Sequence, residues 1–296
     1  MEADASRLPE TGGVIHDIGY RHYDGPRLGR RHAVLALYVH SLRGVFGLGR
    51  PARSKIVPFV LFTIICIPAV ISAAIALLTP LHPIAYTSYA YDLQLPIMLF
   101  VAAQAPQLIT GDLRFRVLPL YFSRPLERND YVWAKLAALA SGLFIVVGIP
   151  ILIMFVAALL GHVTTLRDAW SETRVFLPGV AGVLVTSVLL ASLGLAIACL
   201  TRVRAFAIVA IIGVYLVTSS VVAITMGVAR GTTVARTAGL FTPFQLLDWF
   251  QAWALQVRPT FPPGPGDAGP VYGLMTLALI AAAVGALLLR YRRAEV

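Results

Sequence analysis

Charged residues are scarce in this sequence, and lysine is almost missing. Only 13% of its 296 residues are Asp, Glu, Lys or Arg, and Lys55 and Lys135 are its two lysines. Soluble domains carry about 25% charged residues, so this composition excludes an ordinary soluble fold. Its two cysteines, Cys66 and Cys199, both lie in apolar runs. This predicts small buried side chains rather than a disulfide or a metal site.

The common signatures of catalysis are also missing. There is no GxxxxGK[ST] loop, so the chain should not bind ATP by itself, and HExxH, CxxC and GxSxG are absent too. We therefore expect a protein that is not an enzyme and that holds no metal or cofactor. The first 30 residues contain no apolar stretch. This predicts that no signal peptide is cleaved and that the N-terminus stays in the cytosol.

What the chain has instead is long apolar runs, which raise its hydrophobic content to 58%. About 20 residues at 1.5 Å each span a hydrocarbon core of about 30 Å, and only helices or closed barrels can cross lipid. The predicted fold class is all-α, a polytopic membrane protein with six transmembrane helices. The transmembrane domain, 56–290, lies between cytosolic segments 1–55 and 291–296. The six predicted spans are 56–79, 93–110, 132–160, 174–200, 205–229 and 271–290.

Basic residues gather at the ends of these runs and mostly on one side. If the N-terminus is cytosolic, 19 basic residues fall on the inner side and five on the outer side. The positive-inside rule then places both termini in the cytosol and requires an even number of spans. This distribution argues against a nucleic-acid partner, despite a net charge of +10. The Arg, Ala and Gly bias favours a bacterial source, so the predicted location is the bacterial plasma membrane.

Two further helices are predicted outside the spans. Residues 30–48 place apolar side chains on one helical face and basic ones elsewhere, which predicts an amphipathic helix in the membrane interface. Residues 240–257 form a helical excursion in the last outer loop, with Asp248 and Gln251 on the side opposite its aromatic residues. We interpret this second segment as a re-entrant or outer-surface helix.

A charged island, 110–135, separates the second predicted span from the third. Its apolar Phe115, Leu118 and Leu120 alternate with arginines. Such a segment can lie at the cytosolic interface and offer contacts to a soluble partner. The alternative is a loop whose arginines only set the topology. The candidate partner-contacting residues are Asp112, Arg114, Arg116, Arg124, Pro125, Glu127 and Arg128.

The predicted spans contain no carboxylate, so a proton relay is hard to build from them. Their polar residues are neutral, and Gln104 and Gln107 share one helical face. One interpretation is hydrogen bonding between helices. The other is a weakly polar translocation path, for which the candidates are Gln104, Gln107, Thr218, Ser219 and Ser220.

The charged island also resembles the corresponding segment in permease subunits of the type-2 ABC exporter family. In that family an acidic residue, a short amphipathic helix and a Pro-and-Arg end precede a Lys that opens the third span. The matching residues here are Leu118, Leu120, Ser123, Arg124, Pro125, Arg128 and Lys135. In the first half, Asp112 stands where Glu is more usual, and the Gly often found after it is absent.

This resemblance implies a membrane-spanning subunit that pairs with a second permease copy and docks on separate cytosolic ATPase subunits. The island would be the coupling helix that transmits ATP-driven motion to the spans. The cargo would be largely apolar, such as a drug, peptide or lipid. Two alternatives stay open: an ion-coupled transporter or channel, and a membrane assembly protein without transport activity.

Overall fold

The computed structural model describes residues 28–79, 83–115, 117–123, 125–162, 165–229, 233–260 and 266–292. All regular secondary structure in these ranges is helical, which confirms the all-α prediction for the described part of the chain. Residues 1–27 of the predicted cytosolic segment 1–55, and the tail after Arg292, lie outside the described residues.

The long helices follow the predicted spans in order. They are α2 (Arg53–Leu78), α4 (Gln94–Arg114), α6 (Arg128–His162), α7 (Leu166–Ala198), α8 (Arg204–Val228) and α11 (Gly269–Arg292). The shorter α-helices are α1 (Arg30–Val45), α3 (Tyr89–Asp92), α5 (Leu118–Phe122), α9 (Thr233–Ala238) and α10 (Pro243–Ala254). Two 3₁₀ turns, η1 (Gly239–Phe241) and η2 (Gly266–Ala268), precede α10 and α11.

Five helices in the described ranges, α2, α6, α7, α8 and α11, are long and apolar enough to cross a membrane. They indicate a multi-pass membrane protein. The predicted count of six is not confirmed, because α4 is not among the five. Its 21 residues include Gln94, Gln104 and Gln107, which lower its hydropathy.

Helix α4 is nevertheless the centre of the bundle. It packs against α1, α2, α6, α7 and α8. Ile97, Phe100 and Ala105 are fully buried on it. A helix that contacts protein on most sides can carry amides at membrane depth, because neighbouring helices rather than lipid surround them. The outer helices differ, since α2 and α8 expose apolar side chains such as Ile71 and Val217.

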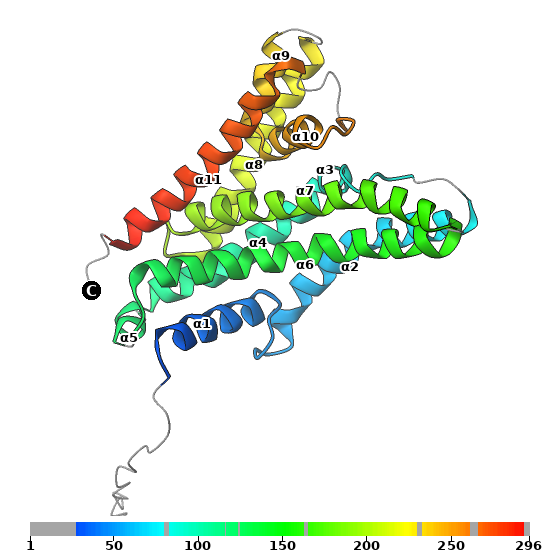
Figure 1. Ribbon diagram of the computed structural model, residues 1–296. Coiled ribbons are helices and arrows are strands. Elements are labelled where there is room, and N and C mark those ends of the chain that lie inside the picture. Colours follow the sequence, from blue (N-terminus) through cyan, green and yellow to red (C-terminus); the bar gives the residue numbers. More distant parts are fainter. Residues whose placement is uncertain are drawn as a thin grey trace, which may run out of the picture.

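Figure 1 shows α6 and α7 side by side along the length of the molecule, with α1 beside the first half of α6. The short helix α5 lies at one end of the bundle, and α9 lies beyond the far end of α8. The charged island therefore occupies an end of the bundle, where α4 stops and α6 starts.

The helix that contains the fourth predicted span begins about two turns before residue 174. Helix α7 begins at Leu166 because Thr165 and Asp168 form a capping box. The Thr165 hydroxyl accepts a hydrogen bond from the Asp168 amide at 3.2 Å, and the Asp168 carboxylate accepts one from the Thr165 amide at 3.1 Å. This cap pairs backbone N–H groups that would otherwise be free at the helix end. The polar residues before 174 therefore belong to the helix, although a hydropathy pattern does not include them.

The helix predicted at 240–257 is observed as α10 (Pro243–Ala254), and its polar side is buried. Asp248 is 7% exposed and Gln251 is 5% exposed. The Asp248 carboxylate accepts hydrogen bonds from the Thr260 amide at 3.0 Å and from the Thr260 hydroxyl at 2.6 Å. The polar face of α10 therefore holds the segment that follows it, because a buried carboxylate needs donors.

Candidate functional site

The charged island folds as a turn, the short helix α5 and a second turn between α4 and α6. Helix α4 continues past the predicted end at 110, so Asp112 lies inside it. The turn closes where the Val117 amide donates to the Asp112 carbonyl at 3.2 Å. Pro119 stands in the first turn of α5, where its missing N–H costs no hydrogen bond.

A buried ion pair ties this turn to α6. The Lys135 ammonium lies 2.9 Å from the Asp112 carboxylate and donates to the Leu108 carbonyl at 2.9 Å. The Tyr131 hydroxyl donates to the same carboxylate at 2.6 Å. The side chains of Lys135 and Asp112 are only 6% and 18% exposed. The carboxylate thus receives two donors from α6, and the end of α4 is fixed to that helix.

Aromatic rings and one arginine bring the last helix into the same place. The rings of Tyr131 and Tyr291 lie 5.1 Å apart, and those of Tyr121 and Tyr131 lie 5.8 Å apart. The Arg128 guanidinium donates to the Arg292 carbonyl at 2.7 Å, near the C-terminal end of α11. Helices α5, α6 and α11 therefore meet at the Tyr131 side chain.

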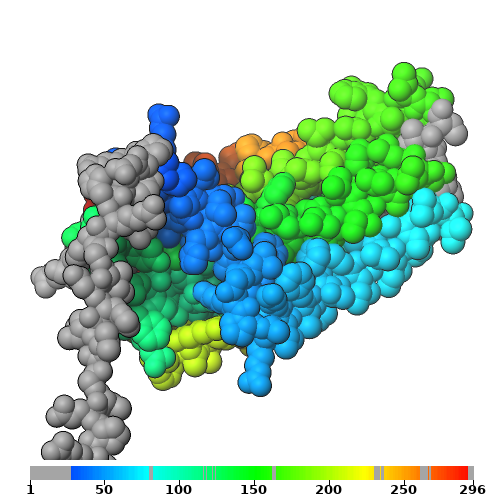
Figure 2. Space-filling view, turned by 90° about the horizontal axis from the view of Figure 1, so that it is seen from below, coloured from blue at the N-terminus to red at the C-terminus, as the bar shows by residue number. Residues whose placement is uncertain are grey.

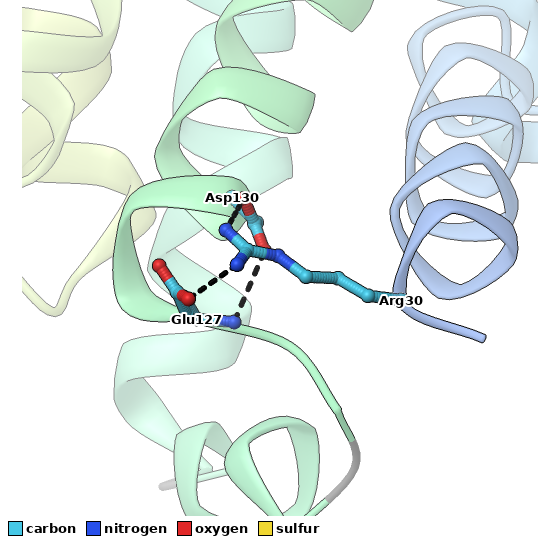
Figure 3. A network of polar contacts seen from close by, with 3 residues as sticks. All are labelled: Arg30, Glu127 and Asp130. Atoms are coloured by element: carbon cyan, nitrogen blue, oxygen red, sulfur yellow. Dashed lines mark hydrogen bonds and ion pairs between the residues drawn. The ribbon is translucent and has the colours of Figure 1, made fainter.

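Arg30 connects α1 to the start of α6 (Figure 3). Its guanidinium donates to both carboxylate oxygens of Asp130, at 2.8 and 2.9 Å, and also to the Glu127 carboxylate. Hydrogen bonding to Asp130 and the two nearby negative charges raise the pKa of Arg30 above its ordinary value. The Glu127 amide donates back to Asp130 at 3.2 Å. Glu127 is therefore an intramolecular partner of α1, although 59% of its side chain is exposed.

The side of the island that faces away from the helical bundle is exposed and accessible to other molecules. Arg114 and Pro125 are exposed, and Phe115 and Leu120 are 72% and 70% exposed. The Arg114 guanidinium lies 5.7 Å from the centre of the Phe115 ring. Arg116 and Arg124, the other two predicted contact residues, lie outside the described residues.

A groove of about 580 Å³ runs between α1 and the island. The α1 side of it includes His32 and His40, and the other side includes Tyr121, Pro125 and Leu126. Exposed apolar side chains next to a groove of this kind can receive a protein segment. The open surface and the groove together form what we call the island surface.

The five candidate translocation residues lie at different depths of the bundle. Gln107 contacts the Gly44 carbonyl and Arg204, whereas Thr218 lies 14 residues after Arg204 on α8, about 21 Å along the helix axis. Thr218 lines an apolar cavity of about 180 Å³ between α4, α7 and α8.

The other three candidates differ in their environments. Gln104 is buried in the bundle, and its side-chain oxygen has no hydrogen-bond partner within the described residues. Ser219 is half-buried, and Ser220 is exposed on the outer face of α8.

The residues that hold the island together are mostly ones that the sequence prediction missed. Arg30 and Asp130 are 100 positions apart, and no local pattern connects them. Lys135 did carry a signal, because it is one of two lysines and stands at the start of a long apolar run. Tyr131 and Tyr291 are ordinary interface aromatics by sequence. Among the described residues, no group of three or more His, Cys, Asp or Glu could hold a metal ion.

Comparisons with known proteins do not assign the chain to a family. No protein-family model matches the chain, and no curated protein matches it. The short helix α5 contacts α6 through the rings of Tyr121 and Tyr131, at the end of the bundle where α6 is joined to α4 and α11.

Proposed function

We propose that this chain is the membrane-spanning subunit of an ATP-driven exporter of the type-2 ABC kind, in which ATP hydrolysis occurs on a separate subunit. The observation that carries the proposal is the island surface. Its outer residues are exposed, and the charged island that carries it joins three long helices: Lys135 and Tyr131 of α6 contact Asp112 of α4, and Arg128 of α6 contacts the Arg292 carbonyl of α11. A partner that moved the island would move α4, α6 and α11 with it.

The chemistry of the island surface fits a soluble protein partner. Phe115 and Leu120 supply apolar contacts, and Arg114 supplies a positive charge beside them. Arginine and aromatic anchors of this type carry most of the binding energy in protein interfaces. An ATPase docked here would close and open on nucleotide, and the Asp112–Lys135 pair would transmit that motion to the bundle. The cavity between α4, α7 and α8 has a mostly apolar lining, which is consistent with a largely apolar cargo.

The test is copurification with an ABC ATPase subunit, sought first in the reading frames that neighbour the gene for this chain. Replacing Leu120 with aspartate should weaken the complex about 30-fold, since losing an interface anchor costs about 2 kcal/mol. The readout is the amount of ATPase retained, together with the ATP hydrolysis rate of the complex. Arg114→Glu should act in the same direction.

Leu166→Asp is the matched control, because Leu166 is 92% exposed and lies at the opposite end of α6 and α7. It should leave the complex intact. Equal ATPase retention by Leu120→Asp and the parent chain would refute the docking role of the island. Transport by the chain alone would favour the ion-coupled alternative, for which the buried Asp112–Lys135 pair is the specific observation.

The proposed second permease copy is expected to pack on α8. Of the five candidate spans, α8 is the least buried by the rest of the chain, with 22% of its apolar segment buried. Its exposed side nevertheless carries a polar residue, Ser220. Hydroxyl groups between membrane helices usually bond to another helix.

In a variant without Cys66 and Cys199, Ser220→Cys should form a disulfide-linked dimer under mild oxidation, seen on non-reducing gels. Ile67→Cys on the exposed face of α2 is the control and should stay monomeric; the reverse pattern would move the dimer interface to α2.

A further inference from the structure

Two arginines that are far apart in the chain come together beside α4. The loop after α1 turns at Gly47, whose φ of 67° is readily adopted by glycine, and carries Arg50 back toward Gly44. A Cβ on Gly44 would lie 3.9 Å from the Arg50 guanidinium. Arg204, the first residue of α8, reaches the same place, because one side chain, Gln107, contacts both Arg204 and the Gly44 carbonyl.

Gln107 holds this arrangement in place. Its side-chain amide donates to the Gly44 carbonyl at 3.0 Å, and its oxygen accepts from the Arg204 guanidinium at 3.2 Å. The same guanidinium lies 3.4 Å from the Ala103 carbonyl. Gln107 thus joins the end of α1 to the start of α8 through α4, and it acts as a positioning residue for Arg204.

No negative charge is paired with these two arginines in the part of the chain that the structure describes. No carboxylate within the described ranges forms a salt bridge with Arg50 or Arg204. Two guanidinium groups held close together without an anion repel each other, and a bound anion removes that repulsion. Arginine is well suited to phosphate, because its planar fork can donate two parallel hydrogen bonds to the phosphate oxygens.

Exposed apolar side chains follow each arginine along the chain, at the start of α2 and of α8. Ile56 and Phe59 at the start of α2 are 57% and 45% exposed, and Phe206 on α8 is 68% exposed. Figure 2 shows yellow-green residues of the α8 region on the same face as the blue α1 and α2 region. A membrane-spanning chain offers such surfaces to acyl chains, so a phosphate bound here would be attached to lipid.

We propose that Arg50 and Arg204 bind the phosphate headgroup of an anionic phospholipid, whose acyl chains lie against the first turns of α2 and α8. The site is distinct from the island surface and requires no ATPase. A lipid bound there would fix the junction of α1, α4 and α8 at the membrane surface. The role of Gln107 would then be to position Arg204 rather than to line a cargo path.

The test uses the purified full chain in a neutral detergent and phosphatidylglycerol labelled on its acyl chain, with binding followed by fluorescence anisotropy. Arg50→Gln and Arg204→Gln should each weaken binding about fivefold, and the double variant about 25-fold, since each basic residue near an anionic lipid contributes about that factor. Gln107→Leu should also weaken binding, because it releases Arg204. Higher salt should reduce the difference between parent and variants.

Arg31→Gln is the matched control, because Arg31 is an exposed arginine at the other end of α1. It should bind as the parent does. Equal binding of labelled phosphatidylcholine, or no loss in the Arg50→Gln/Arg204→Gln variant, would overturn the proposal. Inorganic phosphate should displace the lipid no better than chloride at equal ionic strength. Specific displacement by phosphate would instead identify a site for free phosphate and refute the lipid assignment.

Discussion

Replacing Lys135 with methionine is expected to lower the free energy of unfolding by about 3–5 kcal/mol, because the substitution leaves a mostly buried carboxylate without its counter-ion. Among the described residues, the hydrogen bond from Tyr131 is what remains to Asp112 in that variant. The measurement is equilibrium unfolding in mixed micelles, followed by tryptophan fluorescence and extrapolated to zero denaturant.

The double variant Asp112→Leu/Lys135→Met is the decisive companion. It removes both charges and should recover most of the lost stability, since replacing a whole buried ion pair with apolar groups is often neutral. Lys55→Met, at the other lysine of the chain, should change stability little, because Lys55 forms no salt bridge with any described carboxylate. A loss of about 1 kcal/mol or less for Lys135→Met, as exposed pairs give, would show that this pair is not a structural link.

The positions of the apolar helices could be predicted from the sequence because hydropathy is a local property. Helices α2, α8 and α11 start at 53, 204 and 269, close to the predicted 56, 205 and 271. The prediction failed where polar residues belong to a helix. The capping box at Thr165 starts α7 early, and Asp112 stays inside α4 because α6 neutralises it. Both depend on partners that a hydropathy window does not include.

The island could be located from sequence, but its internal contacts could not. Charge pattern alone makes Glu127 equally suited to a partner protein or to this chain, and the structure pairs it with Arg30. Gln104 and Gln107 share a face by spacing, yet Gln107 bonds to two other elements while Gln104 is enclosed. Side-chain type and spacing define what a residue can bind. The tertiary fold decides which of those partners comes within reach.

Helices α1 and α6 pack closely at Gly142, where α6 has no side chain. A Cβ on Gly142 would lie 2.8 Å from Val45 Cγ1, closer than real Cβ contacts, and Val45 is fully buried. Gly142→Val should therefore lower the free energy of unfolding by about 1–3 kcal/mol, as overpacked cores do. It should also displace α1, so amides in 30–45 should exchange hydrogen faster by mass spectrometry.

Shortening the opposing side chain should reverse the effect. Val45→Ala removes the Cγ1 and Cγ2 atoms that a side chain on Gly142 would meet. Gly142→Val/Val45→Ala should thus be more stable than Gly142→Val alone, and the double-mutant cycle should give a favourable coupling energy. Gly213→Val on α8 is the control, because a Cβ there meets no neighbour within 4 Å and should leave α1 exchange unchanged. Additive losses in the cycle would mean that α1 is held to α6 by contacts other than this one, such as the Arg30 pairs.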